Sequence, residues 1–106
     1  MIYEVEDMKQ ARDFLQINQQ SVVLTNALGS TRYYGFLTVD YMFKALQAEF
    51  PQISDIIINV GDDHSALLSA IKLGYSNIIY NGSAHGETLN KIVGKTLDEF
   101  IKRTQL

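Results

Sequence analysis

The sequence predicts a small α/β domain with a three-stranded parallel sheet. Three short apolar runs, at residues 21–25, 55–60 and 76–80, lack regular polar alternation, which is typical of strands buried on both faces. Segments of helical periodicity precede, separate and follow these runs, so the element order is αβαβαβα over residues 1–106. Strands that alternate with helices are joined by right-handed crossovers and run parallel. Two strand orders fit this pattern: 1-2-3, as in half of a βα-barrel, and 2-1-3, as in a doubly wound sheet.

Each helix is predicted from apolar residues that recur at three- and four-residue spacing. The four segments are residues 6–17, 37–49, 65–73 and 87–103. Pro51 closes the second segment, because proline cannot continue a helix. Gly74 follows the third, where helices commonly end in the left-handed conformation that suits glycine. Residues 26–35 form a loop that exceeds the roughly two to six residues usual between a strand and a helix.

The composition excludes several classes of function. A length of 106 residues suits a single domain, and the lack of cysteine excludes disulfides, thiolate nucleophiles and cysteine-bound metals. The net charge is −3 and the Lys and Arg residues are scattered, which disfavours nucleic acid as a partner. The apolar runs are too short to span a membrane, and the acidic N-terminus differs from the basic start of a secretion signal. We therefore expect a cytoplasmic protein of bacterial type, with no nucleic-acid or membrane partner.

The loops that follow the three strands should meet at one edge of the sheet. In parallel α/β sheets the carboxyl ends of the strands share an edge, and ligands bind there. The loops are residues 26–35, 61–64 and 81–86. Candidate ligand-binding side chains come from all three: Arg32, Asp62, Asp63, His64, Asn81, Ser83 and His85.

The segment Asp62-Asp63-His64 leaves the clearest strand and enters a helix, and two interpretations fit it. Paired carboxylates at this position can hold Mg²⁺, with the histidine as a general base. Aspartate is also among the best helix N-caps, so either carboxylate can serve the helix alone.

The turn at residues 81–86 and Arg32 are the other candidates. Ser83 and two glycines in the turn suit an anion held by backbone N–H groups, and the same residues are good turn formers. His64 and His85 together with Asp62 suit a metal if their strands are neighbours. Arg32 suits a carboxylate or phosphate ligand, or an ion pair with Asp62 or Asp63.

An aromatic cluster surrounds the start of the second helix, and one helix face cannot bury all of it. Its members are Tyr33, Tyr34, Phe36, Tyr41 and Phe43. Exposed aromatic clusters are typical of association surfaces, so we expect self-association as a dimer. The alternative is that these rings pack beneath the long loop.

The central segment also carries a recognisable pattern. A buried strand ends in Gly61-Asp62, a helix of small residues has Ala70 four residues before Gly74, and another apolar strand follows. This pattern resembles a group of small uncharacterised bacterial α/β proteins over roughly residues 22–80. The resemblance implies the fold and adds no chemistry. Asp63 and His64 depart from the group's small residue followed by glycine.

These observations predict a non-enzymatic binding or self-association module that needs no cofactor. The alternative is a small enzyme or sensor that binds an anionic metabolite or Mg²⁺ at the carboxyl edge. Arg32, Asp62 and the turn at residues 82–86 would form that site.

Overall fold

The computed structural model describes residues 1–81, in which strands and helices alternate. In chain order the elements are β1 (Ile2–Val5), α1 (Met8–Ile17), β2 (Val22–Asn26), α2 (Ser30–Tyr33), α3 (Phe36–Glu49), β3 (Ile53–Gly61), α4 (His64–Lys72) and β4 (Ile78–Tyr80). The α/β class and the parallel sheet are confirmed. The helix predicted at residues 87–103 lies outside the described residues.

The sheet contains four parallel strands in the order β1-β2-β3-β4. The prediction of three strands with a helix first is wrong, because it omits β1. That strand has only four residues, and Val5 alone among them is buried, so it contains no continuous apolar run. The three predicted strands pair consecutively, so the order found is the one seen in part of a βα-barrel.

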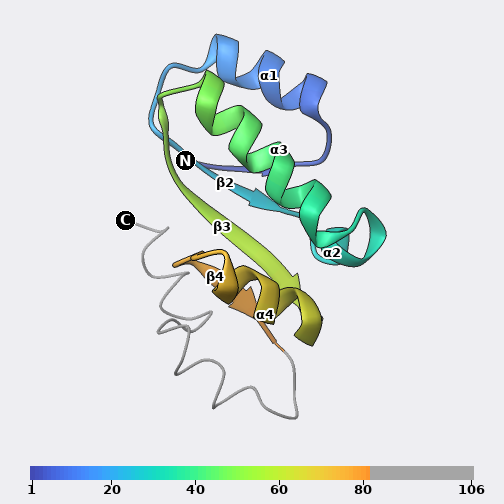
Figure 1. Cartoon of the computed structure of the whole chain (residues 1–106). Helices are drawn as coiled ribbons and strands as arrows, with labels where there is room; N and C mark the ends of the chain where they lie inside the picture. Colours follow the sequence, from blue (N-terminus) through green and yellow to red (C-terminus); the bar gives the residue numbers. More distant parts are fainter. Residues whose placement is uncertain (82–106) are drawn as a thin grey trace.

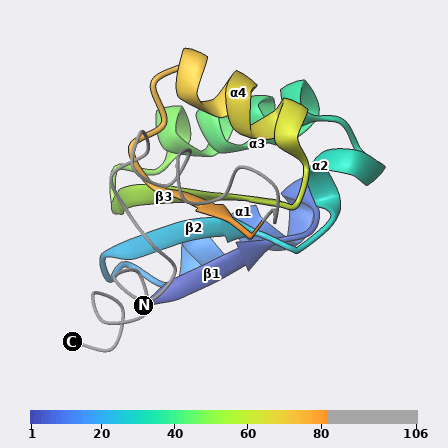
Figure 2. The same cartoon turned by 90° about the horizontal axis from the view of Figure 1, so that it is seen from below.

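Consecutive strand order and right-handed crossovers place the helices on one face of the sheet. Figure 1 shows α1 next to α3, above β2, and α4 in front of β4, and Figure 2 shows α3 and α4 above β3 and β2. Arg12 Nε donates to Glu49 Oε2 at 2.9 Å, which joins α1 to α3. The core draws buried apolar side chains from helices and sheet alike, among them Val5, Ala11, Leu15, Leu24, Val39, Phe43, Leu46, Ile56, Ile58, Leu67 and Ile78. None of the helices within residues 1–81 is long and apolar enough to cross a bilayer.

Helix α4 ends at Lys72, and Gly74, the residue after its C-cap Leu73, has the expected left-handed conformation with φ of +87°. The Gly74 N–H donates to Ile71 O and the Tyr75 N–H donates to Ala70 O, each at 3.0 Å. This pair of hydrogen bonds closes the last helical turn in the arrangement that favours glycine. It also places Tyr75 next to α3.

Tyr75 ties the α4–β4 loop to α3 through Asp40. The Tyr75 hydroxyl donates to Asp40 Oδ1 at 2.5 Å, and Lys44 Nζ donates to Asp40 Oδ2 at 2.9 Å. Asp40 is buried, so these donors replace the water that its carboxylate loses on folding. Burial raises the pKa of the Tyr75 hydroxyl above its ordinary value, and the hydrogen bond to Asp40 and the charge of Asp40 raise it further.

We expect Tyr75→Phe to lower the free energy of unfolding by about 1–3 kcal/mol near neutral pH, because a buried acceptor loses its donor. Since the folded-state pKa is raised, the stability from this hydroxyl is complete below about pH 10 and falls as the pH rises further. Urea unfolding of both proteins at about pH 8 and about pH 11 measures this, and the difference between their free energies of unfolding should be smaller at the higher pH. A difference that grows with pH would contradict the conclusion that the protonated Tyr75 hydroxyl donates to Asp40.

Candidate functional site

The site begins where β2 ends, at Asn26, whose side chain is only 2% exposed. Its Nδ2 donates to the backbone carbonyl of Asn59 and its Oδ1 accepts from the backbone N–H of Asn59, each at 2.8 Å. The last backbone register pair of β2 with β3 is Thr25 with Ile57. The side-chain amide of Asn26 therefore extends the pairing between β2 and β3, while the main chain of Asn26 stays in register with Val5 of β1.

The predicted loop at residues 26–35 is partly wrong, because Asn26 belongs to β2 and residues 30–33 form α2. Asn26 Nδ2 also donates to Ser30 Oγ at 2.7 Å, and that hydroxyl donates to Ala27 O at 2.8 Å. Gly29 and Gly35 flank α2, each with φ of +89°, a backbone conformation that other residues adopt only with strain. The loop is thus an ordered turn, and the hydrogen bonds of Asn26 at the end of β2 set its direction.

Gly61 connects the end of β3 to the residue that follows β4. Its φ is +58°, and a Cβ at this position would lie 2.8 Å from Leu28 Cδ1 on the β2–α2 loop. The Gly61 N–H donates to Asn59 Oδ1 and its carbonyl accepts from the Asn81 N–H, each at 2.9 Å. Glycine is favoured here because other residues adopt this positive φ only with strain.

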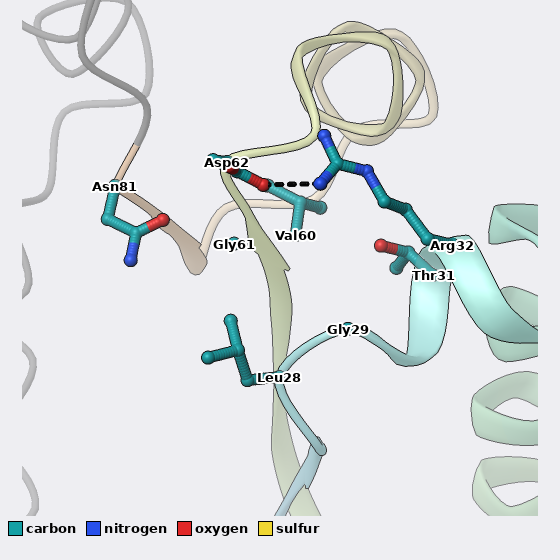
Figure 3. Close-up of a pocket in the computed structure, with 8 residues that line it drawn as sticks. All are labelled: Leu28, Gly29, Thr31, Arg32, Val60, Gly61, Asp62 and Asn81. Atoms are coloured by element: carbon teal, nitrogen blue, oxygen red, sulfur yellow. Dashed lines mark hydrogen bonds and ion pairs between the residues drawn. The ribbon is translucent and has the colours of Figure 1, made fainter.

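These three chain segments enclose a cavity of about 340 Å³, which we name cavity A. Figure 3 shows it at the carboxyl edge, between the β2–α2 turn and the ends of β3 and β4. Its lining residues are Leu28, Gly29, Thr31, Arg32, Val60, Gly61, Asp62 and Asn81. Three of the seven candidate residues from the sequence therefore meet in one cavity: Arg32, Asp62 and Asn81.

The hydroxyl of Thr31 is the unusual group in this cavity. Thr31 is 4% exposed, and its Oγ1 has no hydrogen-bond partner within the part of the chain that the structure describes. In Figure 3 the oxygen points from α2 toward the region of Val60 and Gly61. A buried hydroxyl without a partner destabilises the folded state by about 1–3 kcal/mol. A ligand atom that hydrogen-bonds to this oxygen would replace the hydrogen bond to water that the hydroxyl loses on folding.

An ion pair crosses the outer part of cavity A. Arg32 Nη1 donates to Asp62 Oδ1 at 2.7 Å, which is one of the pairings considered from the sequence. Both side chains are mostly exposed, so the pair is well solvated and contributes at most about 1 kcal/mol. It joins the β2–α2 turn to the β3–α4 turn by a contact that a ligand can displace (Figure 3).

Two other candidate residues, Asp63 and His64, lie outside the lining of cavity A. Asp63 Oδ1 accepts from the Ala66 N–H at 3.1 Å and is the N-cap of α4. His64 is the first residue of α4, outside the lining of cavity A, and its ring is edge-on to Tyr80 at a centroid distance of 6.4 Å. Ser83 and His85 lie outside the described residues. Within residues 1–81 no three His, Cys, Asp or Glu side chains form a group that could hold a metal ion.

A second cavity, cavity B, adjoins the first on the β1 side of the turn. It measures about 400 Å³ and is lined by Val5, Glu6, Ala27, Leu28, Gly29, Ser30, Tyr33 and Tyr34. Leu28 and Gly29 line both cavities. Sequence reasoning missed cavity B, because its wall includes β1, and missed the role of Asn26, whose partner lies 33 residues away.

The aromatic cluster divides between core and surface. Phe43 is fully buried, and Phe36 packs partly buried with its ring edge-on to Tyr75 at 6.2 Å. The remaining three rings are exposed, and Leu37 joins them. These four side chains form the aromatic patch of α2 and α3: Tyr33, Tyr34, Leu37 and Tyr41.

Comparison with known proteins finds one relative of comparable length. The chain is 46% identical over 84 residues to "Uncharacterized protein RP547" from Rickettsia prowazekii (strain Madrid E). The match covers 78% of this chain and 79% of that protein. No family model matches the chain. No solved structure matches it either.

Proposed function

This chain belongs to the same family as the uncharacterized protein RP547 of Rickettsia prowazekii, and we propose that it is a cytoplasmic, non-enzymatic module that binds a small polar ligand in cavity A. The buried, unpartnered hydroxyl of Thr31 carries this proposal. The position of the cavity supports it as well, because ligands of parallel α/β sheets bind at the carboxyl edge. Its volume of about 340 Å³ suits a small molecule.

The remaining polar groups of cavity A suit recognition more than covalent chemistry. Asp62 is paired with Arg32 at 2.7 Å, so its carboxylate is engaged in an ion pair. Thr31 and Asn81 supply neutral hydrogen-bonding groups. A small enzyme at the same edge is the alternative, and it requires turnover of the bound ligand.

The aromatic patch of α2 and α3 favours a second function, self-association into a dimer. Leu37 and Tyr41 are four residues apart on α3 and therefore share one helix face. Leu37 is 74% exposed and Tyr41 is 68% exposed. Exposed apolar side chains on one helix face gain free energy when a partner covers them.

For ligand binding, the discriminating variant is Thr31→Val, which keeps the shape and removes the hydroxyl. We expect it to unfold at a higher temperature than the wild type without ligand, because an unsatisfied buried polar group is removed. We also expect it to lose most of the stabilisation that a ligand gives, which is about 2.7 kcal/mol at a hundredfold excess over Kd. A thermal-shift screen of both proteins against small polar and phosphorylated metabolites measures both effects. Lower stability of Thr31→Val together with an unchanged ligand response would contradict the proposal.

For self-association, sedimentation equilibrium of the wild type should give a dimer. The double variant Leu37→Glu/Tyr41→Glu should be monomeric and folded, because both changed side chains are exposed in the single chain. A wild type that stays monomeric over the whole accessible concentration range would rule out this second function.

A further inference from the structure

Cavities A and B lie next to each other and share a wall. Leu28 and Gly29 line both of them. The Leu28 side chain is 70% exposed, so its position is not fixed by close packing. A ligand that displaces it therefore reaches from one cavity into the other along the carboxyl edge.

The segment formed by α2 and its C-cap Tyr34 contributes different side chains to the two cavities. Thr31 and Arg32 line cavity A, whereas Ser30, Tyr33 and Tyr34 line cavity B. One short segment thus supplies a guanidinium to one side and phenol rings to the other.

Cavity B suits a flat ring. Val5, Ala27 and Leu28 give it apolar walls, and Tyr33 borders it with a side chain that is 82% exposed. The rings of Tyr33 and Tyr34 meet edge-on at a centroid distance of 4.7 Å, which leaves a face of Tyr33 for stacking. Aromatic bases stack on such rings without regard to their identity.

Cavity A suits an anionic group attached to that ring. A guanidinium has five N–H donors, and Asp62 Oδ1 accepts from one nitrogen, Nη1. No other group that interacts with the Arg32 side chain is found in residues 1–81. Because Asp62 is exposed, an incoming anion can replace it at little cost and form the stronger, two-pronged contact that Arg makes with phosphate. The Thr31 hydroxyl and the Asn81 amide supply further hydrogen bonds on the same side.

From this division we propose that cavities A and B together bind one nucleoside monophosphate, with the base beside Tyr33 and the phosphate beside Arg32 and Thr31. This inference rests on the proposed ligand-binding function and assigns its ligand class. The exposed ion pair between Arg32 and Asp62 then holds the guanidinium in place until the phosphate replaces the carboxylate.

The test is isothermal titration calorimetry of the full chain with four probes: AMP, UMP, adenosine and inorganic phosphate. A nucleotide should bind at least about tenfold more tightly than adenosine or phosphate alone, because it engages both cavities. Arg32→Ala should lower the affinity for AMP to that for adenosine. Tyr33→Ala should lower the affinity for AMP toward that for phosphate.

A matched control for Arg32 comes from the same chain. Arg12 is a half-exposed arginine in an ion pair with Glu49, and it lines neither cavity A nor cavity B. Arg12→Ala should leave the AMP affinity unchanged. Asp62→Asn should raise it, because the competing carboxylate is removed.

Each contrary result overturns a defined part. Equal affinity for phosphate and AMP with no effect of Tyr33→Ala would overturn the nucleotide assignment, and the ligand function of cavity A would stand. Failure of all four probes to bind the wild type would also overturn the nucleotide class, whereas the proposed function is judged separately by Thr31→Val. Weaker AMP binding by Asp62→Asn would overturn the exchange of carboxylate for phosphate.

Discussion

The two hydrogen bonds between the side chain of Asn26 and the peptide of Asn59 are the interaction on which the carboxyl edge depends. They keep β2 joined to β3 beyond their last register pair, Thr25 with Ile57. The same amide holds Ser30 Oγ, so the exit from β2 and the entry into α2 are set by one side chain. Cavity A and cavity B lie on the two sides of the turn that results.

The strand order explains why this turn faces the ends of β3 and β4. In a sheet of order β1-β2-β3-β4 the carboxyl ends follow one another in sequence, and each loop meets the next. Gly61 permits contact at Leu28 and accepts from the Asn81 N–H, so it joins the central loop to both neighbours. A doubly wound order would have placed β2 between β3 and β4 and separated Gly61 from Asn81.

Features that depend on residues close together in the sequence were predicted better than features that depend on distant residues. The run at residues 55–60 predicted β3 because a continuous apolar segment is typical of a strand buried on both faces. The cap formed by Asp63 was one of two interpretations, since its partner Ala66 is only three residues away. β1 was missed, because four residues with a single buried side chain lack such a signal and depend on pairing with β2.

The site was predictable only as a region. Arg32 and Asp62 were both named, and both strand orders considered from the sequence place β2 beside β3, so their contact across 30 residues was one of the pairings considered. Asn26 was assigned to the loop that follows the strand, and its buried role depends on Asn59, 33 residues away. Thr31 could not be distinguished from other loop hydroxyls, since its missing partner is a property of the folded chain.

The most direct test of this account is native-state hydrogen exchange at the Asn59 amide in wild type and in Asn26→Asp. That variant keeps an acceptor for the Asn59 N–H, loses the donor to the Asn59 carbonyl, and turns a carboxylate toward acceptor oxygens. We predict that protection of the Asn59 amide falls by about ten- to a hundredfold, the equivalent of roughly 1–3 kcal/mol, while the Leu24 amide within the ladder of β2 keeps most of its protection. Unchanged protection at Asn59 would show that the strand ends are held without the Asn26 side chain, and would contradict the account.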